Sequence, residues 1–170
     1  MSRTEGCSES QLGVSEINTA KISRGALIGA LYAVLTIGLA PISYGPVQFR
    51  VSEALTLLPF YLPEAIPGLF AGCVFANFFG GFGLTDMVFG SLATLIAAIL
   101  SRKSGNIYLA ALWPVVANMV IIGLMLHFLI EAPLMATCLY VGLGEAGACW
   151  LVGIPLMKIL EARRVITRVN

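Results

Sequence analysis

Residues 46–59 place polar and ionisable side chains inside a strongly apolar chain. The segment reads PVQFRVSEALTLLP and carries Gln48, Arg50, Ser52 and Glu53. The whole chain is 58% hydrophobic and only 11% charged, so an arginine and a glutamate three residues apart are costly to bury there. Ionisable groups at membrane depth usually face a cavity or a partner, which predicts that this segment forms one wall of a binding cavity. The alternative is that Arg50 and Glu53 lie at the membrane surface and neutralise each other.

Polar side chains also interrupt the apolar runs that follow, at Asn77, Asp86, Asn118, His127 and Glu145. Asp86 either caps a helix N-terminus, where the helix dipole favours an acid, or contacts a ligand. The two asparagines either hydrogen-bond between helices or contact a ligand. Glu145 lies in GLGEAGA with no basic residue within several positions, and a mid-membrane carboxylate of this kind is more often functional than structural. His127 is interpreted as a residue of the membrane interface.

Composition excludes several classes of protein. A mean hydropathy of +0.91 over 170 residues indicates one membrane domain and no soluble globular domain. The net charge of +1 does not indicate nucleic acid as a partner. The four cysteines show no CxxC or Cys/His spacing, so neither a zinc site nor a disulfide framework is expected. No nucleotide-binding loop, nucleophile motif or metal triad is present, so we expect no catalytic residue, no cofactor and no ATP hydrolysis by this chain.

The apolar runs predict an all-α integral membrane bundle of about six transmembrane helices. The expected spans are residues 25–40, 51–62, 65–79, 85–100, 107–130 and 134–160. The second run is short for a crossing, so it must either recruit the preceding loop or form a broken helix that lines a cavity. The predicted domains are a mobile cytosolic N-terminal tail over residues 1–22, a six-helix membrane domain over residues 23–164 and a cytosolic C-terminal end over residues 165–170.

Basic residues predict the orientation in the cell membrane. With the N-terminus cytosolic, Lys21, Arg24, Arg102, Lys103 and the C-terminal basic cluster all lie inside, and Arg50 alone lies outside. Both termini are then cytosolic in a multi-pass protein. Most of the intramembrane polar groups fall in the outer half of the bundle in this orientation. Such convergence favours a ligand pocket open to the outside over a pore, which needs polar groups along the whole crossing.

Small residues recur on the first predicted helix at Gly25, Ala26, Gly29, Ala30 and Ala33. A stripe of small side chains lets another helix approach the backbone closely. The stripe either packs within the bundle or docks a partner subunit.

Three stretches together resemble the QueT family of queuosine-precursor transporters: RGALIGALYAVLT, VQFRVSEALTLLP and AGCVFANFFGGFGLTDMVFGSLATLIAA. The resemblance covers roughly residues 24–163. It implies a substrate-binding S component of an energy-coupling factor (ECF) transporter, built as a six-helix bundle. Such a subunit captures a deazaguanine base from outside and delivers it inward with a transmembrane coupling subunit and two ATPase subunits. The resemblance also implies that the small residues of the first helix face the coupling subunit.

The polar residues suit this ligand chemically. A guanine-like edge presents adjacent N–H donors that a carboxylate accepts, and its carbonyl needs a donor. The acids are Glu53, Asp86 and Glu145, and the donors are Gln48, Arg50, Asn77 and Asn118. An aminomethyl group on the base requires a second carboxylate, and which acid meets which edge stays open. The alternatives are an S component for riboflavin or thiamine, a small membrane enzyme that uses Glu145 or His127 as acid/base, and a channel.

Overall fold

The chain folds as an all-α membrane bundle. The computed structural model describes residues 6–44, 49–80 and 82–167. In these residues four helical stretches are long and apolar enough to cross a membrane, namely Thr19–Gly38, Leu84–Arg102, Ile107–Ile130 and Leu134–Ala162. Two shorter apolar helices, η1 (Val51–Phe60) and α3 (Ala65–Phe78), bring the apolar segments to the predicted six.

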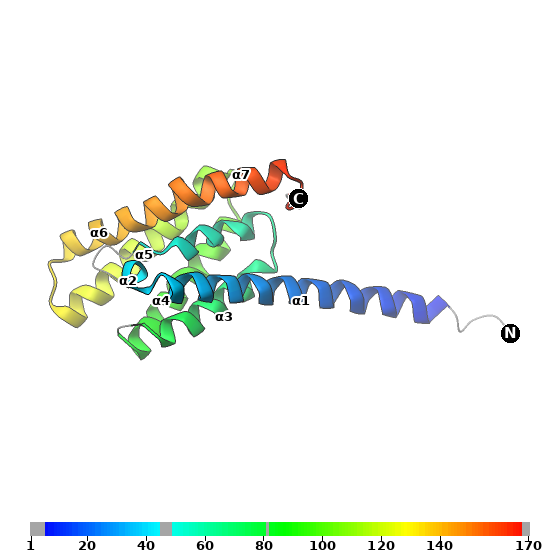
Figure 1. Ribbon diagram of the computed structural model, residues 1–170, viewed down its shortest axis with the longest axis horizontal. Helices are drawn as coiled ribbons and strands as arrows, with labels where there is room; N and C mark the ends of the chain where they lie inside the picture. Colours follow the sequence, from blue (N-terminus) through cyan, green and yellow to red (C-terminus); the bar gives the residue numbers. More distant parts are fainter. Residues whose placement is uncertain (1–5, 45–48, 81, 168–170) are drawn as a thin grey trace.

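The first helix begins earlier than the predicted first span. α1 runs from Gly6 to Gly38, and the short α2 (Ala40–Ser43) follows with Pro41 in its first turn. The segment expected to be a tail is therefore helical from Gly6, while its mobility and its side of the membrane stay predictions. Figure 1 shows the start of α1 and the end of α7 (Ile154–Ala162) at the same end of the bundle.

The short second run forms the centre of the bundle. η1 is a 3₁₀ helix whose residues 52–60 are all buried, with Pro59 inside it. Ten residues of 3₁₀ helix span about 20 Å, whereas ten residues of α-helix span about 15 Å. The tighter winding therefore lengthens a run that is too short to cross as an α-helix. η1 packs against α1, α4 (Leu84–Arg102), α5 (Ile107–Ile130) and the π-helical segment η2 (Gly147–Gly153).

The last span changes its winding where it meets η1. α6 (Leu134–Ala146) continues through η2 into α7 without a break. Two glycines permit the close approach: a Cβ at Gly153 would lie 3.3 Å from the backbone of Ala54, and one at Gly147 would lie 2.6 Å from the ring of Phe49. π-helical turns often occur at functional sites, and Glu145 stands two residues before this one.

Glycines also join α1 to α3. Gly25 and Gly29 face Gly68 and Gly72, and a Cβ at Gly72 would lie 2.8 Å from the Cα of Gly29. Small residues repeated at every fourth position let the two backbones touch, because no side chain separates them. The two helices are parallel, since the earlier glycine of one meets the earlier glycine of the other.

Candidate functional site

The structure buries all of the predicted substrate-binding residues that it describes. These are Arg50, Glu53, Asn77, Asp86, Asn118 and Glu145, each at most 2% exposed. Gln48 lies outside the described residues. Four of the six form a connected cluster around the start of η1, and a fifth, Glu145, lies within electrostatic reach of Glu53 and Arg50. We call these five residues the polar cluster.

Arg50 reaches from the start of η1 to the ends of two neighbouring helices. Its Nη1 donates to Asn77 Oδ1 at 3.2 Å, and its Nη2 lies 3.7 Å from Asp86 Oδ1. Its Nε donates to the Ser43 carbonyl at 3.4 Å, and the guanidinium stands 5.4 Å from the centre of the Tyr44 ring. Arg50 is thus buried and ion-paired with Asp86. The alternative of a surface pair with Glu53 does not describe it.

Asn77 links the ends of α3 and α4. Its Nδ2 donates to the Asp86 carbonyl at 3.1 Å and to Cys73 Sγ at 3.2 Å. Gly90 makes room for this contact, because a Cβ there would overlap the Asn77 amide and lie 3.6 Å from Arg50 Nη1. Asn77 therefore acts between helices, as one of its two interpretations proposed, while it also holds the arginine.

Glu53 is fixed by two hydroxyl groups from different helices. Its Oε1 accepts hydrogen bonds from Tyr32 of α1 and from Thr94 of α4, the latter at 3.0 Å. Cys73 Sγ lies 3.3 Å from the Thr94 hydroxyl, so a continuous chain of polar contacts runs from Arg50 to Glu53. Tyr32, Cys73 and Thr94 were not identified from the sequence, because a lone tyrosine, cysteine or threonine in an apolar helix carries no signal of its own.

Several buried polar atoms of this region have no hydrogen-bond partner in the described part of the chain. They are Ser43 Oγ, Arg50 Nη2, Glu53 Oε2, Asp86 Oδ1, Ser91 Oγ and Glu145 Oε2. A buried donor or acceptor without a partner is expensive, and a buried charge more so. The set includes a donor and three carboxylate oxygens. A small ligand with both acceptors and several N–H donors would satisfy them.

Two other predicted residues bind within their own neighbourhoods. Asn118 donates to the Pro114 carbonyl one turn earlier in α5, at 3.1 Å. His127 Nδ1 lies 2.6 Å from the Ala132 carbonyl in the loop after α5. Within the described part of the chain, neither residue hydrogen-bonds to the polar cluster. Among the described residues, no group of three or more His, Cys, Asp or Glu side chains is placed to hold a metal ion.

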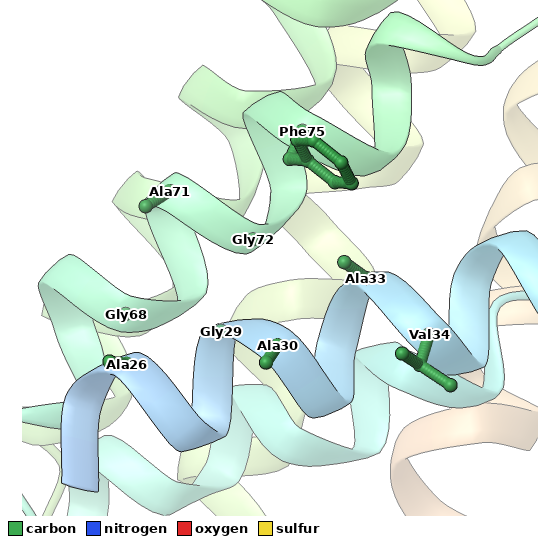
Figure 2. A pocket seen from close by; sticks show the side chains of 9 residues that line it. All are labelled: Ala26, Gly29, Ala30, Ala33, Val34, Gly68, Ala71, Gly72 and Phe75. Carbon is green, nitrogen blue, oxygen red and sulfur yellow. The ribbon is translucent and has the colours of Figure 1, made fainter. Parts of the chain in front are cut away.

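Some of the small residues of α1 pack against α3, and others are exposed. Gly25 and Gly29 are buried against α3, whereas Ala26 and Ala30 are exposed. Between α1 and α3 lies an apolar groove of about 380 Å³ that we call the α1/α3 groove (Figure 2). It is lined by Ala26, Gly29, Ala30, Ala33, Val34, Gly68, Ala71, Gly72 and Phe75. Packing within the bundle thus accounts for the two glycines and leaves the two exposed alanines uncovered.

Comparison with known proteins identifies the family. A sequence model of the QueT transporter family matches residues 22–162. The queuosine precursor transporter QueT of Lactococcus lactis subsp. cremoris (strain MG1363) is 32% identical over 161 residues, which cover 84% of this chain and 93% of that protein. No solved structure matches the chain. The matched region contains the whole polar cluster and all of the residues that line the α1/α3 groove. This chain belongs to the QueT transporter family.

Proposed function

We propose that this protein captures a queuosine precursor, a deazaguanine base, as the substrate-binding S component of an ECF transporter. The observation that carries the proposal is the set of unpartnered buried donors and acceptors around η1. A curated relative at 32% identity is named a queuosine precursor transporter, which supports the same ligand class. The protein itself is proposed to be non-catalytic, in keeping with its membership of a transporter family.

The polar cluster matches the ligand group by group. Arg50 Nη2 is a buried donor without a hydrogen-bond partner and suits the ring carbonyl. Glu53 Oε2 and Glu145 Oε2 are buried acceptors without one, and they suit the N–H groups of the base. Hydrogen bonds in which one partner is charged are the stronger ones, so a neutral ring gains affinity from this setting.

Capture is proposed to occur from outside the cell. The two ends of η1 lie beside different arginines: Arg50 precedes its first residue, and the carbonyl of its last residue, Phe60, accepts a hydrogen bond from Arg102 at 3.3 Å. Lys21, Arg24 and Lys103 join Arg102 on the side that the positive-inside rule makes cytosolic. The polar cluster then lies toward the outer side, and both termini are cytosolic in the cell membrane.

Delivery inward is proposed to require a transmembrane coupling subunit and two ATPase subunits. The sequence contains no nucleotide-binding loop, so the energy for uphill transport must come from partners. The α1/α3 groove supports a docking role, because Ala26 and Ala30 are exposed small residues that admit another helix closely.

The proposed ligand class is tested by thermal unfolding of the detergent-purified protein with a ligand panel. The panel contains aminomethyl-deazaguanine, guanine, riboflavin, thiamine and biotin. A ligand at a hundred times its dissociation constant stabilises the folded state by about 2.7 kcal/mol, so we expect a clear rise in melting temperature with the deazaguanine alone. A rise with riboflavin or thiamine instead would make the protein an S component for another vitamin. No rise with any compound would contradict the proposal.

A further inference from the structure

The carboxylate of Glu53 has one oxygen committed and one free. A carboxylate oxygen offers two lone pairs. The hydroxyl groups of Tyr32 and Thr94 both donate to Oε1, so its two acceptor positions are filled. Oε2 is buried and has no hydrogen-bond partner in the described part of the chain. Glu53 can therefore still accept one donor group of a ligand at Oε2. It lacks the two free oxygens that a pair of adjacent N–H groups would need.

The other two acids of the polar cluster, Asp86 and Glu145, differ in how far their carboxylate oxygens are already engaged. Asp86 lies 3.7 Å from the Arg50 guanidinium and forms an ion pair with it. In the described part of the chain the Glu145 side chain makes no hydrogen bond, its Oε2 is buried without a partner, and it interacts electrostatically with Glu53 and Arg50. Glu145 is thus the acid that keeps its carboxylate available for two adjacent donors.

The shape of the ligand orders these contacts around Arg50. In a deazaguanine that carries a substituent on its five-membered ring, the carbonyl oxygen lies between the two-donor N–H edge and that substituent. Arg50 Nη2 is a buried donor without a hydrogen-bond partner, which suits the carbonyl. Arg50 interacts electrostatically with both Glu53 and Glu145. When Arg50 holds the carbonyl, the ligand is oriented so that one acid meets the N–H edge and the other meets the substituent.

We propose that Glu145 accepts the two-donor edge of the ring and that Glu53 Oε2 accepts a primary ammonium on its substituent, so that the site selects a positively charged deazaguanine. This inference rests on the proposed function and specifies its substrate. The charge count supports it. Among the described residues, the buried ionisable groups of the bundle's centre are one arginine and three acids. Arg50 forms its ion pair with Asp86, so Glu53 and Glu145 have no salt-bridge partner in the described part of the chain. A buried carboxylate that stays charged requires such a partner.

The test compares two ligands that differ in the charge of one substituent. Aminomethyl-deazaguanine and hydroxymethyl-deazaguanine are nearly equal in size, and both offer a donor at the substituent. We expect the wild-type protein to bind the amine roughly 10- to 100-fold more tightly, because a charged hydrogen bond contributes more than a neutral one. Calorimetric titration of the detergent-purified full chain gives both dissociation constants. This comparison needs no variant.

Two isosteric substitutions then assign the acids. Glu53→Gln should reduce the preference for the amine to about threefold or less while hydroxymethyl-deazaguanine still binds. Glu145→Gln should weaken both ligands by a similar factor, roughly 10-fold or more, with the preference retained. Glu161→Gln is the control, because Glu161 is an exposed acid bound to Tyr61 at the other end of η1. It should change neither constant. The melting temperature of each variant checks that it is folded.

Each of the other possible results contradicts one part of the proposal. If the wild-type protein binds both compounds equally, selection by charge is wrong although the proposed function stands. If Glu53→Gln keeps the preference, or Glu145→Gln removes it, the assignment of the two acids is wrong. If neither compound binds the wild-type protein, the proposed function itself fails, and with it the inference.

Discussion

At the scale of single residues, burial separates two ion pairs of similar length. Arg50 and Asp86 lie 3.7 Å apart with side chains 2% and 1% exposed, whereas Arg24 and Glu64 lie 3.6 Å apart with side chains 63% and 12% exposed. Exposed pairs contribute little, because water screens both charges. Removing one member of a buried pair leaves the other charge without compensation. The two pairs therefore allow the stability contributions of a buried and an exposed ion pair of similar length to be compared.

Arg50→Met should destabilise the protein by about 3 kcal/mol or more, because it strands the Asp86 carboxylate. The double variant Arg50→Met/Asp86→Leu should recover much of that loss, since it removes both charges together. Arg24→Met, the control, should cost no more than about 1 kcal/mol. Denaturation in detergent, followed by circular dichroism, measures all three. Equal effects of Arg50→Met and Arg24→Met would show that the burial of Arg50 is not a feature of the protein in solution.

The hydroxyl group of Thr94 should matter for binding more than for folding. Thr94→Val keeps the shape of the side chain but removes the donor that holds Glu53 Oε1 at 3.0 Å. We expect the affinity for aminomethyl-deazaguanine to fall about tenfold, the usual effect of losing one hydrogen bond to a charged group. Thr137→Val is the control, because the Thr137 hydroxyl donates to Pro133 in its own helix. Titration calorimetry decides the matter, and an unchanged affinity in Thr94→Val would count against a ligand at Glu53.

The sequence identified the charged members of the site but not the residues that hold them. Arg50, Glu53, Asp86 and Glu145 stand out because ionisable side chains are rare in apolar runs. Tyr32 does not stand out, since tyrosine is common in membrane helices, and its bond to Glu53 spans 21 residues of sequence. Contacts between distant positions depend on how the helices pack. Periodicity along one helix does not encode that packing.

At the scale of elements, tertiary packing determines the helix type of the segments that the sequence could not assign. Residues 107–130 form a helix with the predicted bounds, because their run is long and mostly apolar. Residues 51–62 were too short to assign to one geometry, and the structure forms η1 there as a 3₁₀ helix buried on every side. The π-helical η2 was not predicted either, since its winding follows from contact with η1. Local propensity does not specify the winding of η1 or of η2, because it depends on packing against the surrounding helices.

The contact between α1 and α3 should tolerate no added methyl group. Gly72→Ala places a Cβ within 2.8 Å of the Gly29 Cα, so the helices must separate. We expect a loss of about 1–3 kcal/mol in stability, as for other overpacked sites. Gly38→Ala lies at the end of the same α1 with nothing within 4 Å of the new Cβ, and it should be neutral. Thermal unfolding compares them, and equal melting temperatures would contradict the glycine contact.

At the scale of the whole molecule, the proposed ligand site and the proposed docking surface lie in different parts of the bundle. The polar cluster surrounds the start of η1 inside the bundle, while the α1/α3 groove opens on its outside. A substitution in the groove should therefore spare ligand binding. This separation suits a subunit that binds substrate by itself and depends on partners for energy.

Ala30→Phe should block assembly with the proposed coupling and ATPase subunits. The phenyl ring would fill part of the α1/α3 groove, where Ala30 is exposed. Leu31→Phe is the control, because Leu31 is exposed on the same helix but does not line the groove. Co-purification from cells that express all four subunits measures assembly, and calorimetry measures ligand affinity, which both variants should keep. Normal assembly of Ala30→Phe would place the docking surface elsewhere.

The most direct test of the central claim is a calorimetric titration of the isolated protein with aminomethyl-deazaguanine, without partners and without ATP. We predict binding of one molecule per chain, and we predict that the double variant Glu53→Gln/Glu145→Gln, shown by its melting temperature to be folded, loses that binding. Undiminished binding by the folded double variant would show that the ligand site lies outside the polar cluster. No binding by the wild-type chain would contradict its proposed role as the subunit that captures the substrate.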